Sequence, residues 1–116
     1  MSQHILNTQQ ADKDIAVMMG WDRPLQGYFM NVVESRTNND KYMYSSSDDP
    51  ALTACGGFPE TVEHFLNQLT QMNISIPEAM LDGVELDGVF NSGNRVVFYN
   101  DDGVVVPVDP DAKVGP

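Results

Sequence analysis

The order of hydrophobic patterns along the chain constrains its fold more than any other feature. An apolar run at 15–19 indicates a strand that is buried on both faces. Residues 28–34 and 41–46 then alternate between two faces, as strands do. The polar segment 36–40, which holds two asparagines, is typical of a hairpin turn. Because short turns join these runs, we expect an antiparallel meander of three strands.

A first helix is predicted to begin at Pro59, since a proline in the first turn loses no intrahelical hydrogen bond. Its apolar residues recur at helical spacing and form one stripe: Val62, Phe65, Leu66, Leu69 and Met72. The preceding segment, 46–57, contains Asp-Pro and Gly-Gly pairs. It is therefore expected to be a loop without regular structure.

A second helix is predicted from about Ile76 to Val89. Ser75 and Glu78 have the spacing of a capping box, in which each side chain bonds the backbone amide of the other residue. Gly83 and Gly88 oppose this helix, because glycine costs about 1 kcal/mol relative to alanine in a helix interior. Whether Gly83 breaks the helix stays open at this level. The two Leu-Asp-Gly-Val sequences repeat with a five-residue period, which matches no repeat architecture.

A late strand is predicted at 95–99, followed by an Asn-Asp-Asp-Gly turn and a short returning strand at 104–108, which Pro107 would restrict to a sheet edge. The fold class is therefore α+β, because runs of strands come before runs of helices. We expect the order β-β-β-α-α-β(-β), with two helices on one face of an antiparallel sheet. The predicted organisation is a flexible lead-in at 1–13, a single domain at 14–108 and a loose tail at 109–116.

The charge of the chain limits its partners. Among 116 residues, 17 are acidic and 6 are basic, and the net charge is −11. Such a field repels nucleic acid and anionic lipid but attracts basic protein surfaces, so we expect another protein as partner, with a homodimer as an alternative. Many of the acids fall in turns, so solubility alone also explains the charge. With no long apolar run and no secretory signal, we expect a cytoplasmic protein.

The residues that most often carry chemistry do not form a recognisable site. His4 lies in the polar lead-in and His64 on the wet face of the first helix, and neither has a local partner. Cys55, the single cysteine, has acidic neighbours that disfavour a thiolate. The aspartate pairs fail the spacing of a calcium-binding loop, and phosphate-binding glycine motifs are absent. We therefore predict no catalytic residues, no cofactor and no metal.

The most distinctive segment is Gly20-Trp-Asp-Arg-Pro-Leu25, which holds the one tryptophan of the chain. Tryptophan and arginine are enriched at binding hot spots, so Trp21, Asp22 and Arg23 are the candidate interaction residues. We expect Trp21 to be half-buried at most. A purely structural role is the alternative, in which Asp22 accepts turn amides and Trp21 closes the open end of the core.

This segment also carries a resemblance. Together with Tyr28-Phe29, Ser47-Asp48-Asp49-Pro50, Ile76-Pro77 and Gly93-Asn94-Arg95-Val96-Val97, it resembles an uncharacterised family of small bacterial proteins with a Gly-Trp-Asp-Arg-Pro-Leu motif. The resemblance spans much of residues 15–99. It implies that these segments belong to one fold, and it attaches no activity to them.

The hypothesis that best fits these observations is a non-enzymatic protein-interaction module. Its binding surface would combine the Trp21 turn with the loop at 45–58. One alternative is a small enzyme or ligand-binding protein with a pocket near Asp22, Arg23 and Arg95. Another is an inhibitor that mimics nucleic acid, although the acids are scattered through turns rather than gathered in one segment.

Overall fold

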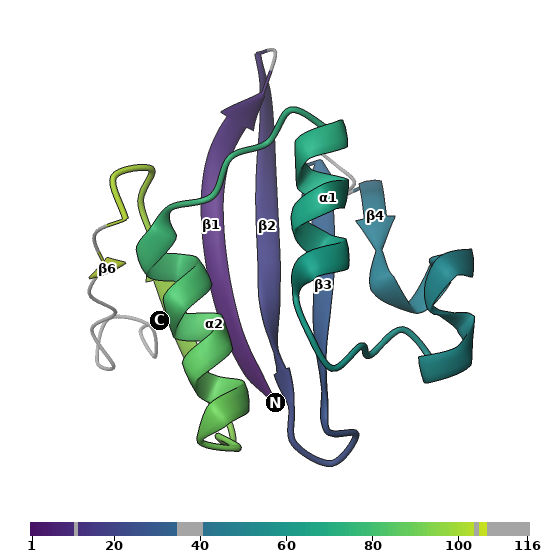
Figure 1. Ribbon diagram of the computed structural model, residues 1–116. Helices are drawn as coiled ribbons and strands as arrows, with labels where there is room; N and C mark the ends of the chain where they lie inside the picture. The colour runs from purple at the N-terminus through teal and green to yellow at the C-terminus, as the bar shows by residue number, and fades with distance from the viewer. Residues whose placement is uncertain (11, 35–40, 104, 107–116) are drawn as a thin grey trace, which may run out of the picture.

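The computed structural model describes residues 1–10, 12–34, 41–103 and 105–106. It has an α+β architecture in which α1 and α2 lie on the same side of a mixed sheet (Figure 1). The strands are β1 (Ser2–Gln10), β2 (Lys13–Asp22), β3 (Gly27–Glu34), β4 (Lys41–Ser45), β5 (Arg95–Tyr99) and β6 (Val105–Val106). The helices are α1 (Glu63–Gln71) and α2 (Glu78–Val89), and the 3-10 turns η1 (Ser46–Asp48) and η2 (Pro50–Cys55) precede them.

The sheet has the strand order β4-β3-β2-β1-β5-β6. The predicted meander is confirmed, since β2, β3 and β4 are antiparallel neighbours. The expectation of a purely antiparallel sheet is wrong, because β5 runs parallel to β1. A parallel pair needs a long crossover, and the segment that contains α1 and α2 supplies it.

The largest correction concerns residues 1–13, which were expected to be a flexible lead-in. They contain β1, which pairs with β2 on one side and with β5 on the other. Ser2, His4 and Leu6 alternate with less buried residues and face the helices. Two of these three inward side chains are polar, so the hydrophobic pattern of a buried strand is not visible in the sequence.

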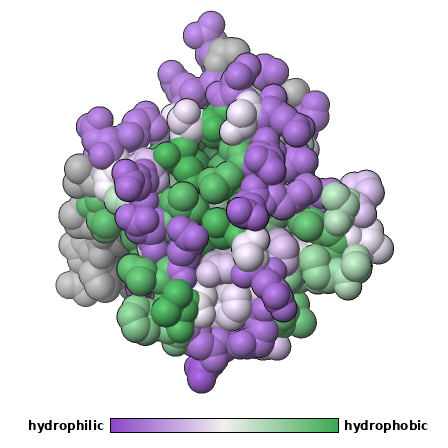
Figure 2. Space-filling model, in the orientation of Figure 1, coloured by the Kyte–Doolittle hydropathy of each residue, from purple (hydrophilic) through white to green (hydrophobic). Residues whose placement is uncertain are grey.

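The core lies between the sheet and the helices. The α1 stripe is confirmed, since Phe65 and Leu69 are buried within it. Residues on the inner face of the sheet complete the cluster, among them Leu6, Ile15, Val17, Met19, Trp21, Tyr28, Met30, Val32 and Tyr99. A hollow between the two helices remains open, and it is lined by apolar residues that include Leu66, Ile74, Ile76 and Leu81 (Figure 2).

Several predicted boundaries differ from the structure. The first helix begins at Glu63 rather than at Pro59. The capping box at Ser75 does not form, because Pro77 occupies the N-cap of α2 and makes no side-chain cap bond. The predicted loop at 46–57 contains η1 and η2, and the Asp49 side chain accepts the Ala51 amide at the start of η2. Short 3-10 turns carry no apolar periodicity, so pattern reading misses them.

The turn before β6 is as predicted. The Gly103 amide donates to the Asn100 carbonyl, and Gly103 has the positive φ that favours glycine. The predicted hairpin turn at 36–40 and tail at 109–116 lie outside the described residues, as do Val104, Pro107 and Val108. No helix in the described part of the chain is long and apolar enough to cross a membrane.

Gly83 does not break α2, and the two glycines of this helix have a packing role. A Cβ at Gly88 would lie 2.0 Å from the Tyr28 hydroxyl oxygen, and one at Gly83 would lie 2.6 Å from that of Tyr99. Both tyrosines are buried, and the Tyr28 hydroxyl donates to the Glu85 carbonyl. The glycines therefore allow the helix backbone to approach the sheet closely enough for these polar contacts.

This packing predicts that Gly88→Ala destabilises the protein, although alanine is the better helix former. We expect a loss of about 1–3 kcal/mol in the free energy of unfolding, because the new methyl group displaces a buried tyrosine. Urea denaturation measures this change. Glu85→Ala, at an exposed position of the same helix, is the control and should be close to neutral. A stabilised Gly88→Ala variant would contradict this account of α2.

Candidate functional site

The β2–β3 turn packs against the connection between α2 and β5. The Trp21 indole N–H donates to Asn91 Oδ1 at 3.0 Å, and the Gln26 side-chain amide donates to the same oxygen at 2.7 Å. Trp21 is 7% exposed, and its ring meets Tyr28 edge to face at 4.9 Å. The expectation that Trp21 is half-buried at most is therefore wrong. An indole ring can be buried beside a polar turn when its N–H is hydrogen-bonded. For Trp21 the acceptor is Asn91, which lies 70 residues later in the chain.

The other two predicted residues have different environments. The Asp22 carboxylate accepts the Leu25 amide at 3.1 Å, and the residue is buried. Asp22 therefore accepts a turn amide, as the structural alternative for this residue predicted. Arg23 is exposed and lies beside Gly93. Of the three candidate residues, Arg23 therefore presents its side chain to solvent.

Exposed apolar side chains lie on the end of α2 and in the β2–β3 turn that holds Arg23, and none of them is among the predicted interaction residues. Phe90 and Val89, at the end of α2, are 73% and 75% exposed. Leu86, one turn earlier, is 50% exposed, and Leu25 in the β2–β3 turn is 59% exposed. Hydrophobic atoms gather over the lower part of α2 in Figure 2. We call Arg23, Leu25, Leu86, Val89 and Phe90 the turn-end surface.

The spacing of Leu86, Val89 and Phe90 was a signal available in the sequence. Residues three and four positions apart lie on one helical face. The spacing alone does not say whether that face is buried or free. Asp82 and Glu85 are exposed on the same helix, so this end of α2 combines apolar side chains with negative charge.

A buried polar network lies beneath α2. His4 Nε2 and Asp87 Oδ2 are 2.5 Å apart, and His4 Nδ1 is 2.8 Å from the Tyr99 hydroxyl. His4 and Asp87 are almost completely buried, and Arg95 lies 3.4 Å from the other Asp87 oxygen. The prediction of a surface histidine without a partner is wrong for His4. Its partner comes from α2, 83 residues later, which no local pattern reveals.

The protonation states in this network follow from burial and hydrogen bonding. Burial lowers the pKa of His4 and outweighs the opposing contact with Asp87, so the ring is neutral. Burial opposes charge on Asp87 too, but hydrogen bonds from His4 and Ser2 prevail and lower its pKa. Burial raises the pKa of Tyr99, which keeps its hydroxyl a donor. Hence Tyr99 donates to His4 Nδ1, and the Nε2–H of His4 donates to Asp87.

The second histidine also has an aspartate partner. His64 Nε2 lies 2.7 Å from Asp49 Oδ2, and the Tyr44 hydroxyl donates to the same oxygen at 2.6 Å. The hydrogen bond from Tyr44 leads the contacts that lower the pKa of Asp49. The expectation that His64 has no partner is therefore wrong. These bonds tie β4, the η2 N-terminus and α1 together, and Asp49 is occupied by them rather than free to hold a metal.

Two further kinds of site were considered in the sequence, namely the single cysteine and a metal site formed by acidic residues. The exposed Cys55 thiol donates to the Leu52 carbonyl. No group of three or more His, Cys, Asp or Glu side chains in the described residues could hold a metal ion.

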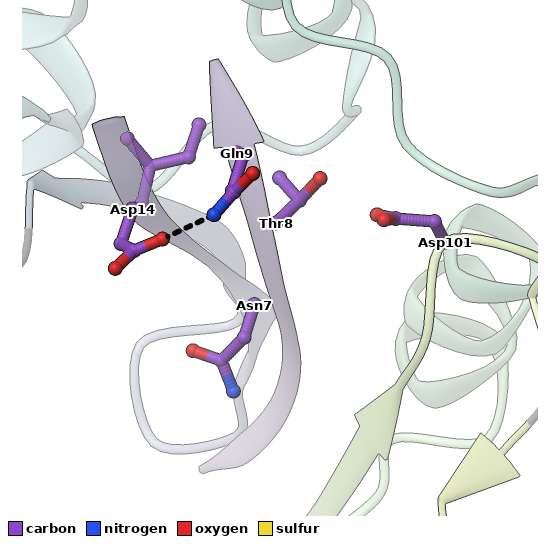
Figure 3. Close-up of a pocket in the computed structure, with 6 residues that line it drawn as sticks. Asn7, Thr8, Gln9, Asp14 and Asp101 are labelled. Carbon is purple, nitrogen blue, oxygen red and sulfur yellow. Dashed lines mark hydrogen bonds between the residues drawn. The ribbon is translucent and has the colours of Figure 1, made fainter. Parts of the chain in front are cut away.

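A pocket of about 420 Å³ lies at the end of β2 remote from Asp22 and Arg23 (Figure 3). Gln9 donates to Asp14 there at 2.9 Å, and Asp101 projects toward Thr8 from the β5–β6 turn. The lining of this pocket holds two carboxylates and no cation, so it suits no anionic ligand.

The buried network predicts that acid destabilises the protein. The pKa of His4 and that of Asp87 are lower in the folded chain than in the unfolded one, so the unfolded chain binds protons more readily. Stability should therefore be fully present above the ordinary histidine pKa of 6.5 and should decline as the pH falls below it. Urea denaturation between about pH 8 and pH 4 measures this decline.

The variants of this experiment separate the two histidines. His4→Leu leaves Asp87 without its main donor and should cost about 3 kcal/mol at neutral pH. The decline just below pH 6.5 should disappear in this variant and persist in His64→Gln. If His4→Leu keeps the same decline, another group is responsible.

Comparisons with models of known protein families, with curated proteins and with solved structures find no match to this chain.

Proposed function

We propose that the chain is a non-enzymatic protein-interaction module that binds its partner through the turn-end surface. One observation carries the proposal: four large apolar side chains at least half exposed and an exposed arginine lie on the β2–β3 turn and on the end of α2, which the bond between Trp21 and Asn91 joins. Large exposed apolar side chains that gather at one place are typical of interaction sites. Aromatic and arginine side chains are also the residues most often found at hot spots.

The spacing on α2 suits a helix that enters a groove. Leu86, Val89 and Phe90 follow the i, i+3, i+4 pattern of helix anchors. Burial of one such side chain contributes about 1.5–3 kcal/mol. Three of them would together contribute about 4.5–9 kcal/mol, which is comparable to the loss of freedom on association, so the polar contacts of the turn-end surface must add to them.

The charges around the anchors indicate the chemistry of the partner. Asp82 and Glu85 lie exposed beside the apolar groups, and the whole chain is strongly acidic. A partner with an apolar groove and a basic rim fits this arrangement, and the charge of the chain would speed the encounter. Arg23 would meet a carboxylate of the partner, because an arginine at an interface is best paired with one.

The sequence motif has a defined place in this proposal. The hexapeptide Gly20–Leu25, which carries the resemblance to a bacterial family, forms the turn that presents Arg23 and Leu25. The bond between Trp21 and Asn91 holds that turn against the end of α2. Membership of that family and a cytoplasmic location in a bacterium are parts of the same proposal.

Site-specific photo-crosslinking in the source cell tests the proposal. Phe90→p-benzoylphenylalanine should give a discrete adduct with another protein, because this side chain is the aromatic ring of the turn-end surface and is 73% exposed. The same substitution at Asn67, exposed on α1, is the control and should not give that adduct. The adduct should fall at least about tenfold when Arg23→Glu is added, since a central interface arginine contributes strongly to affinity.

Two outcomes would reject the turn-end surface as the binding site. One is the absence of any adduct at position 90 in a chain that is folded by circular dichroism. The other is an identical adduct at position 67. The variant Arg23→Lys keeps the positive charge and should retain part of the adduct, which separates a charge effect from a disturbed turn.

A further inference from the structure

The face of the sheet opposite the helices has its own apolar surface. The residues that alternate with the core positions point to it, and the register places Ile5 beside Met18 on one side and Phe98 on the other. None of these three belongs to the core cluster between the sheet and the helices. We call this the open face. Its apolar members are the partly exposed Ile5, Ala16, Met18 and Phe98, together with Phe29 and Val33, which are 6% and 8% exposed.

The open face extends to exposed side chains on either side. Tyr42, paired with Val33, is 60% exposed on β4, and Val96 is 53% exposed on β5. At one corner the Phe29 ring lies against Gly20 and meets Phe58 edge to face, which closes that corner. Apolar residues therefore extend across the face from Tyr42 on β4 to Val96 on β5, with Gln3, Asn7 and Asn31 among them.

The open face is nearly free of charge, although the chain carries a net charge of −11. Among its described strand residues the polar ones are Gln3, Asn7, Gln9, Asn31 and Ser45, and the charged ones are Asp14 and the buried Asp22, at opposite ends of β2. Asp14 stands at the end of β2 and accepts from Gln9. A face built to attract a basic partner would present carboxylates. This face instead allows a second acidic chain to approach without placing like charges in contact.

We propose that a second copy of this chain covers the open face, so that the two sheets pack face to face in a symmetric dimer. Strands about 4.8 Å apart, with about 3.3 Å per residue, give the face from β4 to β5 roughly 550 Å² in projection. The accessible area is larger than this projected area, because side chains protrude from the sheet. Specific interfaces bury at least about 600 Å² per partner. The area therefore suffices for a concentration-dependent dimer.

The symmetry of such a dimer also separates the exposed Asp14 carboxylates of the two copies. A two-fold axis that lies between the sheets and runs across the strands reverses the strand direction of the partner. The Asp14 corner of one copy then faces the Phe29 end of the other, so the two Asp14 carboxylates stay apart. Asp22, at the Phe29 end, is 8% exposed and accepts the Leu25 amide. Aligned sheets pack with their strands about 30° apart and about 10 Å between layers, which matches side chains of this size.

Sedimentation velocity on the purified chain of 116 residues tests the dimer. From about 1 to about 200 µM the mass should rise from that of a monomer toward twice that value, as expected of a modest interface. Raising the salt from about 0.02 to 0.5 M should strengthen the association, because it screens the repulsion between two acidic chains. An association with a basic partner would have the opposite salt dependence.

Matched substitutions locate the interface. Met18→Glu places a charge at the centre of the open face and should raise the dissociation constant at least about 30-fold. Val89→Glu adds the same charge on the turn-end surface and should leave the dimer unchanged. Should Met18→Glu fail to fold by circular dichroism, Val96→Glu at an exposed position of the same face replaces it. If the dissociation constant stays unchanged in Met18→Glu or Val96→Glu, the dimer pairs through another surface, such as a sheet edge, and the proposal is overturned.

A photo-crosslinker identifies the occupant. Tyr42→p-benzoylphenylalanine in the purified chain should give a product of twice the chain mass. A monomer at all concentrations, or a product of unchanged mass linked to residues 107–116, would overturn the proposal. So would a purified monomer whose position 42 crosslinks to a different protein in cells. The crosslinking at Phe90 is independent of all these results, so either proposal can fail alone.

Discussion

The bond between His4 and Asp87 is the interaction on which the arrangement of the molecule depends. It joins His4, the second of the three inward-facing residues of β1, to α2, and both side chains are buried. Such a contact requires the helix to approach the sheet, and Gly83 and Gly88 make that approach possible. The end of α2 then lies beside the β2–β3 turn, and the Asn91 side-chain oxygen accepts a hydrogen bond from the Trp21 indole N–H. The turn-end surface exists because these contacts place the two segments together.

The two proposed surfaces lie on different parts of the fold, so their occupants need not compete. Phe90 stands at the end of the helical layer, whereas Met18 lies at the centre of the sheet on its opposite face. A dimer through the open face would present two turn-end surfaces to a partner. If that partner offers two grooves at a matching distance, binding of the second turn-end surface becomes intramolecular. The overall affinity then exceeds that of one surface alone. The acidic charge would then speed the encounter and keep the chain soluble.

Sequence reasoning succeeded where a local pattern carried the information. The β2–β3–β4 meander, the Phe65 and Leu69 stripe and the turn closed by Gly103 were all predictable from neighbouring residues. It failed where a residue meets a partner far along the chain. His4 was expected in a flexible lead-in and Trp21 in a half-exposed turn, because neither Asp87 nor Asn91 is near in sequence. A polar side chain is recognised as buried only when its hydrogen-bond partner is known.

The sequence by itself determined an acidic α+β chain, most of its strands and helices, and the turn in which Asp22 accepts the Leu25 amide. These follow from short-range physics, namely side-chain periodicity, turn chemistry and net charge. The tertiary structure alone decided that β1 lies inside the sheet parallel to β5, and that Arg23 stays exposed while Trp21 is buried. It also decided which apolar side chains remain in contact with water. Burial depends on what packs against a residue, and the packing partners here are separated by tens of residues along the chain.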